Sequence, residues 1–277
     1  MNGSTLAMEP LALTSDFALT DESVHAFRRD GHVLLRNVAS ADELATYRPA
    51  IKDAVRILQP QLKKMEERDT YGKAFIQVGN IWEHSENAKR FTFARRFAKI
   101  AASLLGVRGV RLYHDQALFK EGGGGPTPWH QDQHYWPLSN NNSITMWMPL
   151  VDLSADMGSM TFASGSQHLG YLGDIPISDH SERYFNDLVK ERQFPTPNMG
   201  ALYAGDATFH YGYMVHGAPG NSTPRMREVM TIIFIDIDMK VVTPMNASQE
   251  ADLRRWFPGL KPGDLAASPL NPVLYEA

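Results

Sequence analysis

The spacing of hydrophobic positions along this chain changes near residue 106. Before that point apolar residues recur every three or four positions, as on one face of a helix, for example at Phe91, Ala94 and Ala98. After it they gather in short segments rich in β-branched and aromatic residues, separated by Gly, Pro, Asn and Asp. The pattern predicts a largely helical part over 1–106 and a β-rich core over 107–240.

Residues typical of helix ends divide the N-terminal part. Thr20 and Ser40 are N-cap residues, and Glu43, three positions after Ser40, completes the spacing of a capping box. Gly31 and Gly106 are typical of the position just after a helix. Together with the hydrophobic spacing, these residues predict helices at 20–29, 40–58 and 87–105.

Strands are predicted where β-branched and aromatic residues form short runs between turn-forming residues. Such runs lie at 32–38, 107–119, 143–153, 158–162, 200–203, 207–213 and 228–237. They favour a mainly β fold, an antiparallel sandwich or jelly roll flanked by N-terminal α-helices. No repeat or linker interrupts the pattern. We therefore expect a single domain over 1–277, with 241–277 as a C-terminal tail packed across the barrel.

Composition narrows the classes of function. The net charge of -4 and the lack of a basic stripe argue against a nucleic-acid partner, and no apolar run is long enough to span a membrane. Without cysteine there is no disulfide, thiolate nucleophile or cysteine-bound metal. The N-terminus does not read as a secretory signal, so we expect a cytoplasmic protein with a small-molecule partner. The sequence carries no signal for an oligomeric state.

The chemistry that the sequence favours lies around His130 and Asp132. Side chains two positions apart on a strand leave from the same face, so this imidazole and this carboxylate could hold one metal ion together. Pro128 and Pro137 limit helix formation on both sides, which favours the extended backbone that such a pair requires. A distant histidine would complete the two-histidine, one-carboxylate site of non-haem Fe(II) oxygenases.

The pair alone is weak evidence, because a histidine followed two positions later by an acidic residue also occurs at His84–Glu86 and His180–Glu182. The first lies at a predicted helix start, where Ser and Glu are expected as cap residues. The second lies in a polar segment that we expect to be a solvated loop. Context favours the pair at His130, although a histidine simply hydrogen-bonded to Asp132 would explain that pair equally well.

His216 is the best candidate for the distant histidine. It follows an aromatic strand and precedes a Gly/Pro/Asn turn; His210, six positions earlier, is a rival that spacing alone does not exclude. Arg227 lies at the start of the next predicted strand. Its planar guanidinium can bind a carboxylate through two hydrogen bonds, as an acidic cosubstrate such as 2-oxoglutarate would need. Arg225 is the alternative donor.

With these residues in this order, the chain resembles the phytanoyl-CoA dioxygenase family of Fe(II)/2-oxoglutarate-dependent oxygenases over roughly residues 20–237. The resemblance rests on three segments, His130–Pro137, Gly158–His168 and Gly205–Arg227. Arg227 follows His216 by eleven positions, the usual spacing in that family. The resemblance implies a double-stranded β-helix (jelly-roll) core, and it makes His210 and Arg225 the weaker candidates.

The resemblance also implies an enzyme, a hydroxylase that uses Fe(II), 2-oxoglutarate and O2 and releases succinate and CO2. It assigns the metal to His130, Asp132 and His216, and 2-oxoglutarate to Arg227, Gln116 and Trp147. The serine hydroxyl that many members place near the cosubstrate carboxylate is missing, because Ala218 stands there. The side chains expected to face the substrate are Gln133, His134, Trp136 and Lys120.

The substrate class follows only in outline. No basic cluster suits the phosphates of coenzyme A, so we expect oxidation of an unactivated C–H bond in a small metabolite or a natural product of secondary metabolism. Two other functions are compatible with the same three ligands: a Zn-dependent hydrolase and a non-enzymatic ligand-binding jelly roll. The zinc hypothesis leaves Arg227 unexplained.

Overall fold

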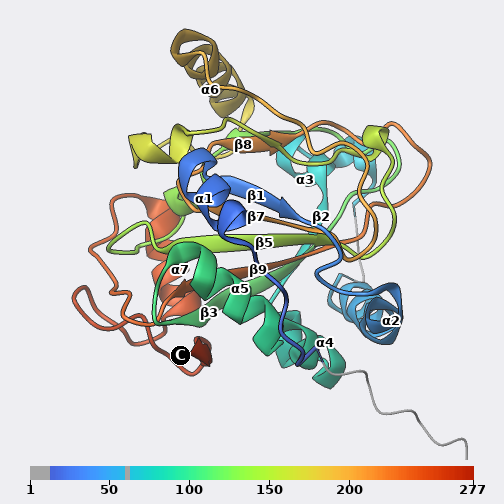
Figure 1. Ribbon diagram of the computed structural model, residues 1–277. Helices are drawn as coiled ribbons and strands as arrows, with labels where there is room; N and C mark the ends of the chain where they lie inside the picture. The colour runs from blue at the N-terminus through green and yellow to red at the C-terminus, as the bar shows by residue number, and fades with distance from the viewer. Residues whose placement is uncertain (1–12, 60–62) are drawn as a thin grey trace, which may run out of the picture.

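Two antiparallel sheets form the core of the computed structural model, which describes residues 13–59 and 63–277. The strands of the large sheet are, in order across it, β1 His32–Leu35, β7 Ala207–Tyr211, β5 Ser143–Pro149, β9 Val229–Asp236, β3 Gly109–Phe119 and β10 Val273–Glu276, and β2 Ile76–Gly79 pairs with β3. The small sheet contains β4 Thr127–His130, β8 His216–Ala218 and β6 Thr161–Phe162. It lies over one face of the large sheet (Figure 1). The jelly-roll core is as predicted.

Helices cover the outside of this core (Figure 1). The α-helices of the described residues are α1 Asp21–Asp30, α2 Ala41–Leu58, α3 Thr70–Ala74, α4 Glu86–Thr92, α5 Arg95–Leu105, α6 Asp179–Arg192 and α7 Ala247–Trp256. Short 3-10 turns lie at Met65–Glu67, Ile81–Glu83, Asp132–His134, Ala155–Met157 and Ser166–Leu169. No helix in this part of the chain is long and apolar enough to cross a membrane.

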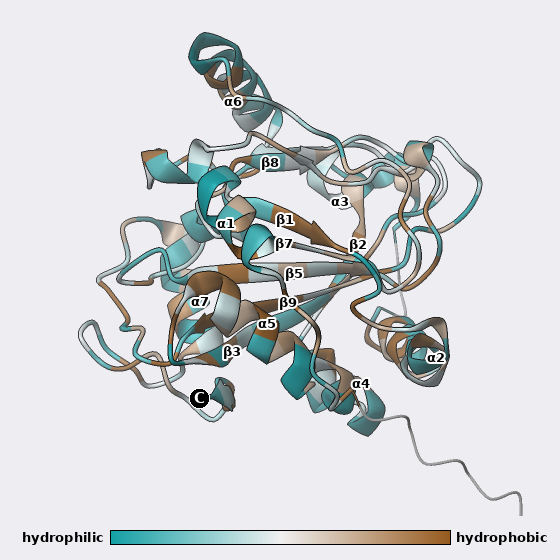
Figure 2. Cartoon of the chain, in the orientation of Figure 1, coloured by the Kyte–Doolittle hydropathy of each residue, from teal (hydrophilic) through white to brown (hydrophobic). Residues whose placement is uncertain are grey.

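The central strands divide their side chains between two environments. On β5, Ile144, Met146 and Met148 join the main hydrophobic cluster together with side chains of α5. Thr145 and Trp147, which alternate with them, face the space below the small sheet. The central strands carry mostly hydrophobic colour in Figure 2, whereas the projecting α6 is mostly hydrophilic. One face of the large sheet therefore builds the core, and the other is free to build a site.

The predicted helix ends are confirmed where local signals are strong. The Thr20 side chain accepts a hydrogen bond from the Ser23 amide, and Gly31 ends α1 with a φ of 83°, a conformation that glycine adopts without strain. Ser40 and Glu43 form both hydrogen bonds of a capping box at the start of α2. These ends depend on residues within one turn, so the sequence alone reveals them.

The predicted helix over 87–105 is wrong in one respect, because the structure divides it into α4 and α5. The chain leaves helical geometry at Ala94, whose ψ is 117°. The break lets the rings of Phe91 and Phe97 pack edge to face, with centroids 5.2 Å apart. Tertiary packing overrides the continuous hydrophobic spacing here.

Other differences concern segments whose pattern was weak. The expected loop around residue 180 is the start of α6, with Ser178 as its N-cap. The tail 241–277 contains α7 and the strand β10. The expected strand at 200–203 is reduced to an isolated bridge between Leu153 and Leu202, and the strand expected over 32–38 ends at Leu35. The strand misses lie where pairing with a distant segment decides the conformation, whereas α6 and α7 were missed because their polar faces obscure the hydrophobic spacing.

Candidate functional site

A cavity of about 290 Å³ lies between the two sheets. Its floor is formed by side chains of β3, β5, β7 and β9, and its opposite wall by β4 and β8 of the small sheet. Residues of α3, β2 and α7 complete the rim. The cavity therefore combines side chains from segments that are far apart in the sequence.

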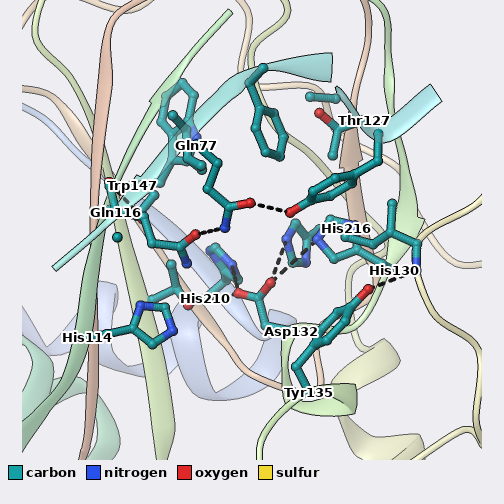
Figure 3. A pocket seen from close by; sticks show the side chains of 18 of the residues that line it. Gln77, His114, Gln116, Thr127, His130, Asp132, Tyr135, Trp147, His210 and His216 are labelled. Carbon is teal, nitrogen blue, oxygen red and sulfur yellow. Dashed lines mark hydrogen bonds and ion pairs between the residues drawn. The ribbon is translucent and has the colours of Figure 1, made fainter. Parts of the chain in front are cut away.

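His130, Asp132 and His216 lie together in this cavity (Figure 3). One ligand atom from each lies within 4.8 Å of the others. The Asp132 Oδ1 atom is 3.4 Å from His130 Nε2 and 3.6 Å from His216 Nε2. Over residues 13–59 and 63–277, no other group of His, Cys, Asp or Glu could hold a metal ion in this way.

Backbone pairing sets the positions of the two histidines. His130 at the end of β4 is the direct antiparallel partner of His216 at the start of β8. Asp132 does not continue the strand, as the sequence suggested, but opens a 3-10 turn. Gln131 between them is extended, with φ -113° and ψ 129°, so the carboxylate still turns to the same side as His130.

The imidazoles present their Nε2 atoms to the centre of the group. His130 Nδ1 lies 2.7 Å from the Pro128 carbonyl oxygen, and His216 Nδ1 lies 2.9 Å from that of Met214. Each Nδ1–H donates to a carbonyl, which fixes the ring and leaves the Nε2 lone pair available to a metal. Burial also holds the pKa of His216 well below its usual value, which favours the neutral form that metal binding needs.

The Asp132 carboxylate is oriented from the large sheet. Its Oδ2 atom accepts a hydrogen bond from Thr145 Oγ1 at 2.9 Å and lies 3.3 Å from His210 Nε2. Burial alone would raise the pKa of Asp132, but His216, His130 and His210 hold it well below the usual range. The rival histidine His210 thus lies in the site but contacts Asp132 Oδ2, while Oδ1 faces the other two imidazoles.

The two competing His–acid pairs lie elsewhere. His84 belongs to the turn before α4, where Ser85 is the N-cap. His180 is exposed on α6. Glu182 on the same helix accepts a hydrogen bond from the Trp129 amide at 2.8 Å, so it links α6 to β4, the strand that carries His130, instead of being solvated.

Arg227 is buried at the inner end of the cavity with no acidic partner. Its Nη1 donates to the Gly158 carbonyl, and its guanidinium carbon lies 5.4 Å from the centre of the Trp147 ring. Its Nε has no hydrogen-bond partner, and the described residues offer it no ion pair. Burial lowers its pKa to about 9. An uncompensated buried cation beside a metal site fits a carboxylate ligand.

The alternative Arg225 is exposed, and its side chain donates to the Asp152 carbonyl instead of entering the cavity. Trp147 and Gln116, expected from the family resemblance to bind 2-oxoglutarate, both line the cavity (Figure 3). The Gln116 amide oxygen accepts a hydrogen bond from Gln77 Nε2. Ala218 also lines the wall, at the position where a serine was expected from the family pattern.

The four side chains expected to face the substrate have different positions. Trp136 lines the cavity. Gln133 lies behind it, because its amide donates to the Asn140 carbonyl and accepts from Ser143 Oγ. His134 is buried outside the lining, with Nε2 3.6 Å from Asp174. Lys120 is fully buried beside Thr127, and burial, with the nearby Arg227 charge, lowers its pKa to about 6.

The expectation that Gln133, His134 and Lys120 face the substrate therefore does not fit their positions. The sequence interpretation missed other side chains that line the cavity, namely Tyr71, Gln77, His114, Tyr135, Asp252, Arg255 and Trp256. Most belong to segments whose pairing with the core has no local signal. The aromatic cluster after Asp132 was the one signal that could have indicated Tyr135.

Comparison with known proteins places this fold and site in a family. The model of the family "Phytanoyl-CoA dioxygenase (PhyH)" matches residues 27–229, the segment that holds His130, Asp132, His216 and Arg227. The chain belongs to the phytanoyl-CoA dioxygenase family. The resemblance inferred from the sequence is thereby confirmed, and with it the class of enzyme, an Fe(II)/2-oxoglutarate-dependent dioxygenase.

Proteins similar to this chain have assigned activities. Ectoine dioxygenase of Stutzerimonas stutzeri (strain A1501) is 24% identical over 264 residues, covering 86% of this chain and 84% of the relative. The structure of the non-haem α-ketoglutarate-dependent carbocyclase SnoK from nogalamycin biosynthesis superposes with a TM-score of 0.74 at 24% identity, over 92% of this chain and 96% of that one. The epimerase SnoN of the same biosynthesis gives 0.72 at 27% identity, over 92% and 98%. The shared fold extends over nearly the whole chain.

Proposed function

We propose that His130, Asp132 and His216 bind Fe(II), and that the enzyme uses 2-oxoglutarate and O2 to hydroxylate an unactivated C–H bond of a small molecule. The observation that carries this proposal is the convergence of the two Nε2 atoms on Asp132 Oδ1. Three protein ligands on one side of a metal leave positions open for other ligands. When bound, iron and 2-oxoglutarate supply the oxidant, and succinate and CO2 are released.

Arg227 would hold the distal carboxylate of 2-oxoglutarate. Its charge is buried and its Nε is unsatisfied, so a carboxylate would supply both the missing charge and the missing acceptor. Trp147 packs against the guanidinium and restricts its orientation. The remaining cavity side chains exclude water and orient the substrate; among them Thr145 and His210 keep Asp132 Oδ2 occupied.

A small substrate fits the cavity, whose volume lies near the lower end of the range for ligand pockets. The cavity wall contains two arginines, Arg227 at the inner end and Arg255, and no lysine, so it offers no basic cluster for several phosphates. The names of similar proteins point to more than one substrate class: ectoine for the ectoine dioxygenase and nogalamycin biosynthesis for SnoK and SnoN, but an acyl-CoA for the peroxisomal phytanoyl-CoA dioxygenase of Mus musculus. The choice between these classes therefore rests on the cavity. Its size and lining favour a small metabolite or natural product over an acyl-CoA.

The iron assignment is tested by anaerobic addition of Fe(II) and 2-oxoglutarate to the purified protein. We expect a weak visible metal-to-ligand charge-transfer band, and 2-oxoglutarate-dependent succinate release once O2 is admitted. Asp132→Ala removes one of three ligands and should abolish both signals. Asp187→Ala, an exposed carboxylate on α6, is the matched control and should change neither. Hydrolytic activity with Zn2+ and no band with Fe(II) would instead favour a zinc hydrolase.

The cosubstrate assignment is tested by comparing two arginines two positions apart. Arg227→Ala should raise the 2-oxoglutarate concentration for half-maximal turnover roughly 30-fold or more, because losing one partner of a buried charge pair costs about 2–5 kcal/mol. The exposed Arg225→Ala should leave it unchanged. The reverse result would assign the carboxylate to Arg225.

A further inference from the structure

The helix α7 supplies part of the cavity wall, although it lies beyond the segment matched by the family model. Three of its residues, Asp252, Arg255 and Trp256, line the same cavity as the metal-binding group. The rest of the wall comes from the two sheets and α3 and their connections. Side chains of α7 are therefore candidates for contacts specific to this enzyme's own substrate.

This helix is fixed to the metal-binding turn. Asn246 and Gln249, at the start of α7, both donate side-chain hydrogen bonds to the His134 carbonyl oxygen, at 3.3 and 3.2 Å. His134 ends the turn that begins at Asp132. At the other end, the Trp256 ring stacks on His114 of β3, with centroids 4.5 Å apart. The position of α7 relative to the reaction centre is thus set by contacts at both ends.

Asp252 offers an acceptor oxygen to the cavity. Its Oδ2 accepts the Tyr113 hydroxyl hydrogen at 2.8 Å, and the Trp256 side chain also donates to the carboxyl group. A carboxylate has about four acceptor sites, so Asp252 keeps acceptor capacity towards the cavity that it lines. Burial raises its pKa to about 7, although Tyr113 and Arg255 act in the opposite direction. A carboxyl group in this state is suited to a neutral hydrogen-bond donor, because an added positive charge would also face Arg255.

Tyr135 provides a donor close to the same space. Its hydroxyl oxygen accepts a hydrogen bond from the Ile177 amide at 2.9 Å, so the hydroxyl hydrogen is free to be donated. A phenol hydroxyl keeps its hydrogen at neutral pH, so Tyr135 can act as a donor. Tyr135 and Asp252 line the same cavity of about 290 Å³ as the metal-binding group.

Flat side chains enclose this pair of polar groups. Trp136, Phe75 and Trp256 line the same cavity. The Trp256 ring already stacks on His114 and on the Arg255 guanidinium, with its centre 4.5 and 4.3 Å away, so Trp136 and Phe75 are the rings left for a ligand. Aromatic faces bind the apolar faces of rings, and they offer nothing to a carboxylate or a phosphate. The surroundings favour an uncharged ring over a flexible ionic chain.

We propose that Asp252 and Tyr135 form a specificity site for a hydroxyl group on an uncharged cyclic substrate, with Asp252 accepting the hydroxyl hydrogen and Tyr135 donating to its oxygen. This inference rests on the proposed oxygenase function. It names the substrate class of that oxygenase as cyclic alcohols. It also means that α7, through Asp252, contributes to substrate specificity.

The first experiment measures which compounds raise succinate release above the substrate-free rate. The probes are cyclic alcohols and methyl glycosides, each compared with the amine and the carboxylic acid of the same skeleton. We expect alcohols to stimulate turnover, and the amines and acids to have little effect. A preference for amines or acids, or no response to any alcohol, overturns the proposal.

The second experiment uses the most active alcohol and its methyl ether. Asp252→Ala should raise KM for the alcohol about 10-fold or more, the usual effect of losing a hydrogen bond to a charged group, with kcat little changed. The ether has no hydrogen to donate, so its KM should be the same in wild type and variant. Asp252→Asn, which keeps an acceptor oxygen, should restore most of the affinity for the alcohol. An equal change for alcohol and ether, or no change, contradicts the assignment.

Two controls separate this inference from the function on which it rests. Glu250→Ala changes an exposed carboxylate on the same helix and should leave both KM values unaltered. The Fe(II)/2-oxoglutarate band is recorded before any probe is added. Its absence in wild type refutes the oxygenase itself, whereas its presence in Asp252→Ala shows that the variant is folded and loaded. Tyr135→Phe, which removes only a hydroxyl, should raise KM for alcohol and ether alike.

Discussion

Buried polar side chains around the cavity differ in whether a partner lies within the protein. Asp132 has several partners, whereas Arg227, a buried cation, and Lys120, a buried amine, form no ion pair within the described residues. Burying a charge without a counter-charge opposes folding. Both residues therefore reduce stability in the free enzyme. Arg227 does so as a buried charge, which a carboxylate ligand would offset, and Lys120 does so because folding lowers its pKa to about 6 and costs it its proton at neutral pH.

Lys120 should make stability depend on pH. Its pKa is about 6 in the folded protein against 10.5 as the reference value, so between these limits the unfolded chain binds one more proton. The free energy of unfolding then rises with pH across this window, by up to about 1.4 kcal/mol per unit from this group, and the cost is fully present below pH 6. Lys120→Met should be more stable than wild type at pH 6.5, with the gain shrinking towards pH 9. Urea unfolding at both values measures it, and parallel profiles would contradict the assignment.

His210 should affect metal affinity without being a ligand. His210→Phe removes the contact to Asp132 Oδ2 and leaves the three ligands in place. Loss of such a supporting contact typically weakens metal binding about 10- to 100-fold. Calorimetric titration of the metal-free protein with Co2+ checks this without measuring turnover, and His210→Gln, which keeps an N–H donor, should recover part of the affinity. Unchanged binding in the Phe variant would refute the supporting role.

For single residues, the sequence predicted which side chains form the candidate metal site better than it predicted their hydrogen-bond partners. The two-residue spacing of His130 and Asp132 indicated a shared face, and the family pattern selected His216. Nothing local could show that His210 meets Asp132, because this depends on its pairing with Thr145 across β7 and β5. The choice between His210 and His216 is a matter of strand register, which one sequence does not specify.

Elements whose ends are set locally were predictable, whereas those fixed by distant contacts were not. The capping box of α2 lies within four consecutive positions, and the structure reproduces it. The boundary between α4 and α5 instead follows from packing of Phe91 against Phe97. The turn-forming residues near 180 and 245 looked like loops because they cap helices whose polar faces obscure the hydrophobic spacing.

Removal of the α2 cap should lower stability measurably. Ser40→Ala deletes the acceptor for the Glu43 amide, and N-cap substitutions of this type cost about 1 kcal/mol. Glu43 also binds Arg96 of α5 through 2.7 and 2.9 Å contacts, so the loosened cap should weaken the attachment of α2. Thermal unfolding should show a Tm lower by about 2–4 °C. Ser103→Ala, on an exposed position of α5, is the matched control and should not lower Tm. Equal Tm values for wild type and Ser40→Ala would contradict the role of the cap.

At the scale of the whole molecule, two sheets face each other and the cavity lies between them. The composition of the strands predicted the jelly roll, but strand order was not readable from it. The strands β1, β2 and β10 come from outside the predicted core and join the large sheet by long-range pairing. The cavity likewise assembles residues from position 71 to position 256. The sequence predicted Trp136 at the cavity, whereas the lining residues from α3, β2 and α7 could not be predicted from it.

Ligand binding should stabilise the molecule in two separable steps. A ligand at 100 times its Kd stabilises the folded state by about 2.7 kcal/mol, which corresponds to roughly 5–10 °C in Tm. We expect Tm to rise once when Co2+ is added to chelator-treated protein and a second time when 2-oxoglutarate is added. Arg227→Ala should keep the first rise and lose most of the second. Differential scanning calorimetry measures both, and a full second rise in the variant would argue against Arg227 as the cosubstrate anchor.

The direct pairing of His130 with His216 has a consequence for how the metal is lost. Both imidazoles belong to one short pair of hydrogen-bonded strands, β4 and β8. If these strands separate, the metal ion loses the geometry of two of its three ligands at once. Release of the ion and separation of β4 from β8 would then be a single event, without a half-coordinated state. Amide protons of β8 should exchange with solvent at the rate at which the bound ion exchanges with free metal.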